Sequence, residues 1–115
     1  MSKAFRTELA AAASTIDGIT CLPYYVQSTE VGAAMVRLDR IEYPNFTGGI
    51  NYWSLVVILP QDMAAAEEWV DENVAPIITA IEHLIVVTQV QPQRLGLLDG
   101  SVVLAVFING HREKE

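Results

Sequence analysis

Apolar side chains recur along the chain with two different periods, which predict two helices and five strands. Near the N-terminus they are spaced by four, three and four positions, as on one face of an amphipathic helix: Phe5, Leu9, Ala12 and Ile16. Ser2 is a candidate cap, and Gly18 can adopt the left-handed conformation that ends many helices. We therefore expect a first helix that begins after Ser2 and stops at Asp17 and Gly18.

Two strands are expected next. Residues 20–27 contain Pro23, which cannot donate a hydrogen bond to a neighbouring strand, so we place this segment at a sheet edge. Residues 34–43 form a second strand, in which the apolar positions change face near Asp39 and Arg40. Because strand side chains alternate between faces with a period of two, this change predicts a β-bulge. The stretch 44–49 is expected to be a loop.

The third strand, residues 52–59, is apolar on both of its faces. One face carries Trp53, Leu55, Val57 and Leu59, and the other becomes apolar at Val56 and Ile58. This pattern is typical of a central strand that is covered on both sides.

A second helix is predicted after this strand. Asp62 is placed to cap it, and apolar residues then repeat at helical spacing: Val70, Val74, Ile77, Ile81 and Leu84. Pro76 falls inside this repeat and has no N–H for the carbonyl of Glu72, so we expect the helix to kink or restart there.

The C-terminal part predicts a hairpin. Its strands are residues 84–91 and 101–109, and the connection over residues 92–100 is long and rich in leucine. Residues 110–115 are expected to be a frayed tail.

The expected order is α-β-β-β-α-β-β, in a single domain over residues 1–115. This is an α+β fold, with a four- to five-stranded mixed or antiparallel sheet and two helices packed on one face. Two helices cover about one face of such a sheet, yet at least two strands are apolar on both faces. This excess of apolar surface predicts a partner that covers it, and further copies of the chain are the simplest such partner. The candidate interface residues are Tyr43, Phe46, Tyr52, Val56, Ile58, Arg94, Leu95, Leu97 and Leu98.

Composition narrows the class of partner. Hydrophobic residues make up 51% of the chain and charged residues 18%, and the net charge is −7 with seven scattered basic residues. Tight nucleic-acid binders gather basic residues on one surface, so we expect no such activity. No apolar run approaches the about 20 residues that span a membrane. The single cysteine, Cys21, leaves no internal disulfide and no cysteine-built zinc site.

No motif predicts an enzyme, a metal site or a cofactor. His83 and His111 are the only histidines, and neither has a ligand partner at suitable spacing, so we expect surface positions. Glu68, Asp71 and Glu72 share the polar face of the second helix. Calcium loops place acids along a glycine-containing turn, so these three predict a solvated helix face instead.

Three segments carry a family resemblance: YWSLVVILP at 52–60, DMAAAEEWVDENVAPIITAIE at 62–82 and GSVVLAVFING at 100–110. Together with the preceding helix and strands, their order resembles the tail terminator (tail completion) proteins of long-tailed bacteriophages over most of the chain. The resemblance implies a ring, typically of six copies, that sits on the last ring of the tail tube. Such a ring ends tube polymerisation and offers the surface to which a filled head attaches.

The resemblance also implies partners and a location. The partners are further copies of the chain, the major tail tube protein and head–tail connector or neck proteins, and the location is the head-proximal end of the tail in a virion assembled in the host cytoplasm. Six copies at −7 each would carry a formal charge of −42, and an acidic lumen would let DNA pass without binding. The candidate lumen acids are Glu30, Asp39, Glu42 and Asp99.

Two alternatives stay open. One is a head–tail connector or neck protein of the same virion. The other is a small dimeric α+β ligand-binding domain, which a pocket with converging polar groups would favour.

Overall fold

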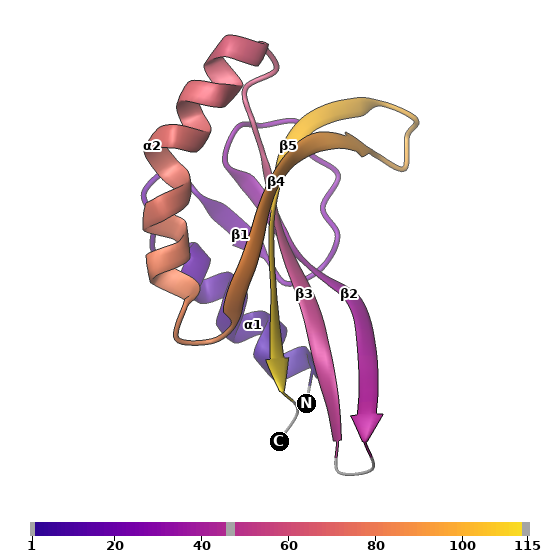
Figure 1. The fold of residues 1–115 in the computed structure, drawn as a ribbon. Helices are drawn as coiled ribbons and strands as arrows, with labels where there is room; N and C mark the ends of the chain where they lie inside the picture. The colour runs from indigo at the N-terminus through magenta and orange to yellow at the C-terminus, as the bar shows by residue number, and fades with distance from the viewer. Residues whose placement is uncertain (1, 46–47, 114–115) are drawn as a thin grey trace.

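Five strands form one twisted sheet, and both helices pack against the same face of it (Figure 1). The computed structural model describes residues 2–45 and 48–113. The elements in chain order are α1 (Ser2–Ala13), β1 (Thr20–Leu22), β2 (Ala33–Asn45), β3 (Gly48–Ile58), α2 (Met63–Ile81), β4 (Val86–Gly96) and β5 (Val102–Glu113). This confirms the predicted α+β class and the predicted order of elements.

The strands lie in the order β1-β2-β3-β5-β4. β1 runs parallel to β2, and the other neighbouring pairs are antiparallel, so the sheet is mixed. β3 lies at the centre, as its two apolar faces predict. β1 lies at an edge, also as predicted, but it ends at Leu22, directly before Pro23.

The main core lies between the two helices and the near face of the sheet. Leu9 and Ala13 come from α1, and Ile77 and Ile81 come from α2; all four are fully buried. The sheet contributes Val36, Trp53, Leu55, Val57, Val106 and Ile108. Full burial of one large apolar side chain contributes about 1.5–3 kcal/mol, so this layer stabilises the fold more than any other group of contacts.

A second, smaller core lies on the far face of the sheet. Val56 and Ile58 are fully buried there, with Met35, Leu97, Val103, Ala105 and Phe107. The loop of residues 23–32 covers this core with Val26, and the end of the β4–β5 hairpin curls toward it with Leu95 (Figure 1). The expectation that Val56 and Ile58 offer surface to a neighbouring subunit is therefore corrected, because the chain covers them itself.

The predicted bulge in β2 is present at Asp39. Leu38 pairs with Trp53 and Arg40 pairs with Tyr52, so Asp39 is an extra residue without a partner on β3. The extra residue keeps Ile41 on the helix side of the sheet, together with Val36 and Leu38.

β2 and β3 form a long hairpin that projects beyond the body of the molecule (Figure 1). Asn45 pairs with Gly48, so the expected loop over 44–49 is wrong, and both strands continue almost to the turn. Phe46 and Thr47 lie outside the described residues. The molecule is therefore elongated, with dimensions of 46 × 30 × 21 Å.

The helices differ from expectation mainly at their ends. α1 ends at Ala13, and a turn then leads to Gly18, whose φ of +88° is the left-handed conformation. α2 begins as predicted, because the Asp62 carboxylate accepts a hydrogen bond of 3.0 Å from the N–H of Ala65. It runs without a break past Pro76 to Ile81, so the predicted restart is absent.

The C-terminal hairpin is longer than predicted at both ends. β4 continues to Gly96 in place of the expected connection over 92–100, and Pro92 is accommodated because β4 is an edge strand. β5 continues through His111 and Arg112 to Glu113, so those residues of the expected frayed tail belong to the sheet. None of the described helices is both long and apolar enough to cross a membrane.

Candidate functional site

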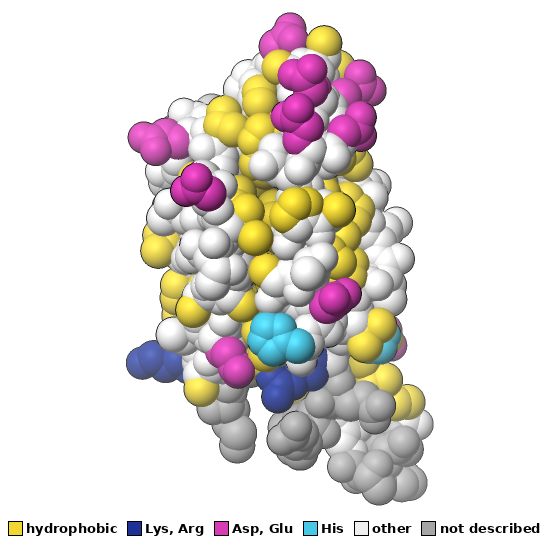
Figure 2. All heavy atoms as spheres, turned by 90° about the vertical axis from the view of Figure 1, so that its left-hand side faces the viewer, with side chains coloured by type: hydrophobic (Ala, Val, Ile, Leu, Met, Phe, Trp, Pro, Cys, Tyr) yellow, Lys and Arg dark blue, Asp and Glu magenta, His cyan; other side chains and the backbone are white. Residues whose placement is uncertain are grey.

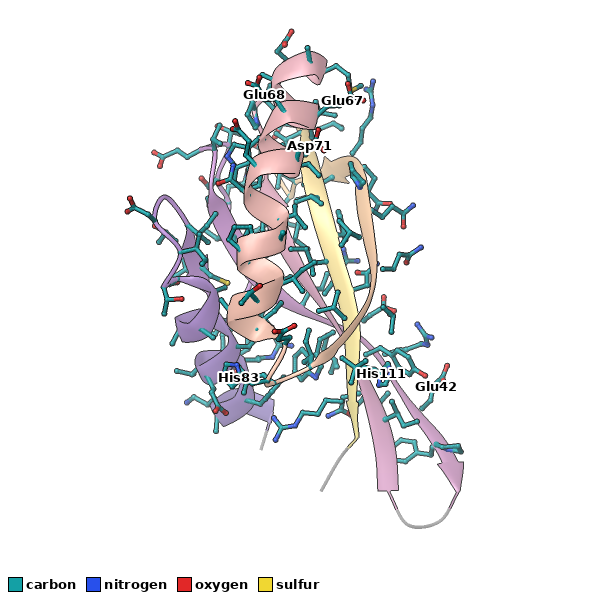
Figure 3. All side chains as sticks on the ribbon, turned by 60° about the vertical axis from the view of Figure 1, so that its left-hand side comes forward. Glu42, Glu67, Glu68, Asp71, His83 and His111 are labelled. Carbon is teal, nitrogen blue, oxygen red and sulfur yellow. The ribbon has the colours of Figure 1, made fainter. Side chains whose placement is uncertain are left out.

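The titratable groups that the structure describes form no recognisable catalytic or metal centre. Within residues 2–45 and 48–113, no cluster of three or more His, Cys, Asp and Glu side chains could hold a metal ion. His83 at the end of α2 and His111 in β5 line one shallow depression of about 220 Å³ with Glu82 and Arg112 (Figure 3). The sequence did not predict that the two histidines line one depression, because β5 was expected to end at Asn109, before His111.

Cys21 lies in β1 with its thiol buried. Burial raises its pKa to about 12, because a thiolate would lose its hydration there. The hydroxyl of Ser14 accepts a hydrogen bond of 2.9 Å from the Cys21 N–H and donates one of 3.3 Å to the Cys21 carbonyl. Reactive cysteines have lowered pKa values, so Cys21 is a structural residue.

A groove with a volume of about 620 Å³ lies between α2 and the β4–β5 hairpin. We call it the α2 groove. Its apolar lining comprises Leu59, Met63, Ala66, Val70, Leu104 and Ala105. Glu67 and Asp71 on α2 form one wall, and Pro92, Gln93 and Arg94 on β4 form the other. Figure 3 shows Glu67 and Asp71 on the side of α2 that faces these strands.

Hydrogen bonds close the floor of the α2 groove. The side chain of Gln61 accepts a bond of 2.8 Å from the N–H of Leu104 and donates to the carbonyls of Leu59 and Leu104. The N–H of Leu59 also donates to the carbonyl of Leu104 at 3.0 Å. Three of these hydrogen bonds fix the chain between β3 and α2 against β5, so the groove is a preformed feature.

Charge is distributed unevenly between the two ends of the molecule. Figure 2 shows acidic side chains gathered over the N-terminal half of α2, exposed apolar side chains beside them, and Lys and Arg side chains near the opposite end. The acids there are Asp62, Glu67, Glu68, Asp71 and Glu72, all exposed, and α2 contains no lysine or arginine. Glu68 and Asp71 were predicted to lie on a solvated face, and the structure places them at the surface.

The opposite end carries stacked arginines. Arg112 lies over the ring of Phe5 at 4.2 Å, and Arg6 lies over the rings of Tyr24 at 4.6 Å and Trp53 at 5.3 Å. Lys3 is exposed in the first turn of α1. The same end bears the β2–β3 hairpin, so cationic and apolar groups lie together there.

The predicted interface residues separate into exposed and buried groups. Tyr43 is 63% exposed on the β2–β3 hairpin, and Leu98 is 85% exposed in the turn between β4 and β5. Arg94 is also exposed, Leu95 is half-buried, and Leu97 belongs to the second core. Phe46 lies outside the described residues.

Tyr52 and the predicted lumen acids Asp39 and Glu42 surround one arginine. Arg40 forms ion pairs of 2.8 Å with Asp39 and with Glu42, and its guanidinium lies 3.9 Å from the centre of the Tyr52 ring. The Tyr52 hydroxyl donates to Glu42 at 3.1 Å. The hydrogen bond from Arg40, followed by that from Tyr52, lowers the pKa of Glu42. These two acids are therefore partly neutralised.

The other two predicted lumen acids lie outside the β2–β3 hairpin, in the turn between β4 and β5 and in the loop before β2. Asp99 accepts hydrogen bonds from the hydroxyl and the N–H of Ser101, at 2.6 and 2.9 Å, and these bonds lower the pKa of Asp99. Glu30 is exposed in the loop before β2. The four acids thus form two separate groups.

A polar depression of about 320 Å³ lies on the far face beyond the second core. The Ser54 hydroxyl donates to the side-chain oxygen of Asn109 at 2.6 Å, and the Asn109 amide donates to Gln89 at 3.2 Å. Arg37, Gln91 and Gln93 also line this hollow. An amide oxygen cannot act as a general base toward Ser54, so the arrangement suits binding and offers no activated nucleophile.

No family model matches the chain, and no curated protein matches it significantly.

Proposed function

We propose that this protein is a structural virion assembly protein, which caps the tail tube of a long-tailed bacteriophage as a ring. In that role it ends polymerisation of the tube protein and provides the surface for head attachment. The order α1-β1-β2-β3-α2-β4-β5 supports the proposal, because it agrees with the layout that the resemblance implies.

The observation that carries the proposal is the exposure of large apolar side chains at both hairpin ends. Tyr43 is 63% exposed on one hairpin and Leu98 is 85% exposed on the other. The fold does not need these side chains at the surface, and clustered exposed apolar groups mark sites of protein–protein contact. Surfaces at two opposite ends of a chain suit an assembly in which each copy contacts more than one neighbour.

The ion pairs of the predicted lumen acids decide which of them could make the proposed lumen negative. Asp39 and Glu42 are paired with Arg40, whereas Glu30 forms no ion pair with any residue that the structure describes. An acidic lumen would therefore depend on Glu30 and Asp99 more than on the other two. Replacing Glu30 and Asp99 with lysine should slow genome ejection, and ejection at the normal rate would exclude them from the DNA path.

Electron microscopy of phage particles made with and without this protein tests the proposal. Overlong tails in its absence establish tail termination. Tails of normal length without heads assign the protein to the connector or neck class instead, and normal particles reject both roles. Restoring the protein from a plasmid should reverse the defect, which controls for effects on neighbouring genes.

A small ligand-binding domain is the second candidate, and the polar depression on the far face favours it. Ser54, Gln89, Asn109 and Arg37 converge on a hollow whose volume falls at the lower end of the about 300–1,000 Å³ range of ligand pockets. Nuclear magnetic resonance with a panel of sugars, nucleotides and carboxylates would detect a ligand by shifts at these residues. Shifts that vanish in Arg37→Ala would support this candidate.

A further inference from the structure

The α2 groove and the β2–β3 hairpin lie at opposite ends of the molecule (Figure 1). The groove is formed by the N-terminal half of α2 and the distal part of the β4–β5 hairpin. Its lining is apolar, and Met63 at its edge is 61% exposed. Glu67 and Asp71 on one wall make that wall acidic, with Asp62, Glu68 and Glu72 nearby on the same helix end.

The hairpin end has the opposite properties. Ile41 and Tyr43, which we call the hairpin patch, are 39% and 63% exposed. Both side chains pack against Gly49, where a Cβ atom would come within 2.9 Å of Tyr43 and 3.0 Å of Ile41. The backbone of β3 therefore supports the hairpin patch from behind, so its two side chains are presented in a fixed arrangement.

Cationic groups accompany the hairpin patch. Arg112 pairs with Asn51 across β5 and β3, and Asn51 pairs with Ile41, so these residues form one row across the sheet. Lys3 and Arg6 lie in the first turns of α1, on the same side of the sheet. This end is thus apolar and basic on the helix side of the sheet, whereas the α2 groove is apolar with an acidic α2 wall, Glu67 and Asp71, and the cation Arg94 on its other wall.

We infer that the hairpin patch of one copy docks into the α2 groove of a second copy, so that copies of the chain join head to tail. This contact deepens the proposed function, and its closure into a ring rests on that function. Complementary charge on the two ends favours this partner over a hairpin-to-hairpin contact, which would bring like charges together. A contact between two different surfaces repeats from copy to copy and produces a ring when the rotation closes.

The dimensions agree with the inferred contact. A groove of about 620 Å³ lies within the about 300–1,000 Å³ range of pockets that hold compact ligands, so its volume is sufficient for an isoleucine and a tyrosine side chain.

Disulfide trapping between two single-cysteine variants tests the contact. Tyr43→Cys and Met63→Cys change exposed side chains, so both variants should fold. Native Cys21 is buried and should give no background, which the unchanged protein controls. After mild oxidation of the mixture, mass spectrometry of linked peptides should find the cysteine introduced at position 43 joined to the cysteine introduced at position 63 of another copy.

A matched pair of controls separates the specific contact from random collision. Thr79→Cys lies on α2 outside the groove and should not link to the hairpin variant. Adding Glu67→Lys and Asp71→Lys to Met63→Cys should slow trapping about tenfold by like-charge repulsion, whereas adding Glu68→Lys, which lies outside the groove lining, should have less effect. Equal rates for all these variants would contradict the inference.

Three results would overturn the contact outright. They are links between two hairpin cysteines, links to Thr79→Cys as fast as to Met63→Cys, and no links at the highest soluble concentration. The experiment uses the purified chain alone, so it is separable from the phage experiment. If disulfide trapping succeeds but a phage lacking the protein has normal tails, only the tail role is rejected. If trapping fails but that phage has overlong tails, only this contact is rejected.

Discussion

The backbone N–H of Leu98 donates a hydrogen bond of 3.0 Å to the hydroxyl oxygen of Tyr25. These residues are 73 positions apart in the chain. The bond ties the turn between β4 and β5 to the loop of residues 23–32, and these are the two segments that cover the second core.

Tyr25→Phe should loosen this connection. The substitution removes this bond and the bond of 2.5 Å that the Tyr25 hydroxyl donates to Gln27, and one exposed hydrogen bond contributes at most about 0.5–1.5 kcal/mol to stability. We expect a small fall in the free energy of unfolding and faster hydrogen exchange at the Leu98 amide. Tyr24→Phe is the matched control, since the ring that contacts Arg6 is kept and the Leu98 amide is not its partner. Equal Leu98 exchange in the two variants would contradict the assigned role of Tyr25.

Loss of the α2 cap should destabilise the protein measurably. Asp62→Ala removes the carboxylate that accepts from the Ala65 N–H, which costs about 0.5–2 kcal/mol. For a domain of this size the melting temperature should fall by about 4 °C per kcal/mol. Asp62→Ser keeps an oxygen at the cap and should retain most of the stability in the same thermal scan.

The second core should behave as the interior of a single copy. Ile58→Ala removes a fully buried side chain, and we expect a loss of about 2–5 kcal/mol in urea unfolding. Val102→Ala, at a position that is 57% exposed, should change stability by no more than about 0.5 kcal/mol. If Ile58 instead lay at an interface between copies, its effect would depend on protein concentration. A constant effect is the expected result.

The Glu42 carboxyl should titrate below its ordinary pKa. Because hydrogen bonds from Arg40 and Tyr52 favour the carboxylate, the folded state holds this proton less tightly than the unfolded state does. The associated stabilisation is present above the unfolded pKa and is lost as the pH falls through the folded pKa. Carbon-13 chemical shifts of the Glu42 side chain measure this directly.

Two variants separate the causes of the Glu42 shift. Arg40→Gln should move the Glu42 pKa toward its ordinary value, and Tyr52→Phe should move it in the same direction by less, because the bond from Arg40 is the larger cause. A larger effect from Tyr52→Phe than from Arg40→Gln would reverse this assignment.

Cys21 should be unreactive in the folded protein. Its pKa is about 12, against an ordinary value of 9.0, so almost no thiolate exists at pH 8. Iodoacetamide should modify it only after denaturation. The sign of the pH effect follows from the same shift: above pH 9 the unfolded state loses the thiol proton first, so stability falls as the pH rises toward 12. Cys21→Ala should remove this loss of stability at alkaline pH. If the loss persists in Cys21→Ala, another titrating group causes it.

The order of elements could be predicted from the sequence because each element carries a local signal. The bulge at Asp39 is the clearest case, since Val36 and Leu38 lie out of phase with Ile41 and the structure resolves this with one unpaired residue. The cap at Asp62 and the edge position of β1 likewise depend on adjacent residues alone.

Features that depend on tertiary contact were not predictable in the same way. Val56 and Ile58 have the pattern of a covered strand, but no periodicity shows that an irregular loop supplies the cover. β4 contains Pro92 among glutamines and reads as a connection, although an edge strand tolerates both. The α2 groove joins Leu59, which follows β3, with residues of α2, β4 and β5, so it arises only when the hairpin curls beside the helix.

The unpaired residue Asp39 determines which side chains of the hairpin lie on each face of the sheet. Beyond it, Ile41 and Tyr43 lie on the helix side, while Arg40 lies with Tyr52 on the far side. Strict alternation along the same residues, without the bulge, would place Ile41 and Tyr43 on the far side and Arg40 on the helix side. The bulge therefore lets one strand present apolar side chains to the helix side along its whole length, although its sequence changes phase at Asp39.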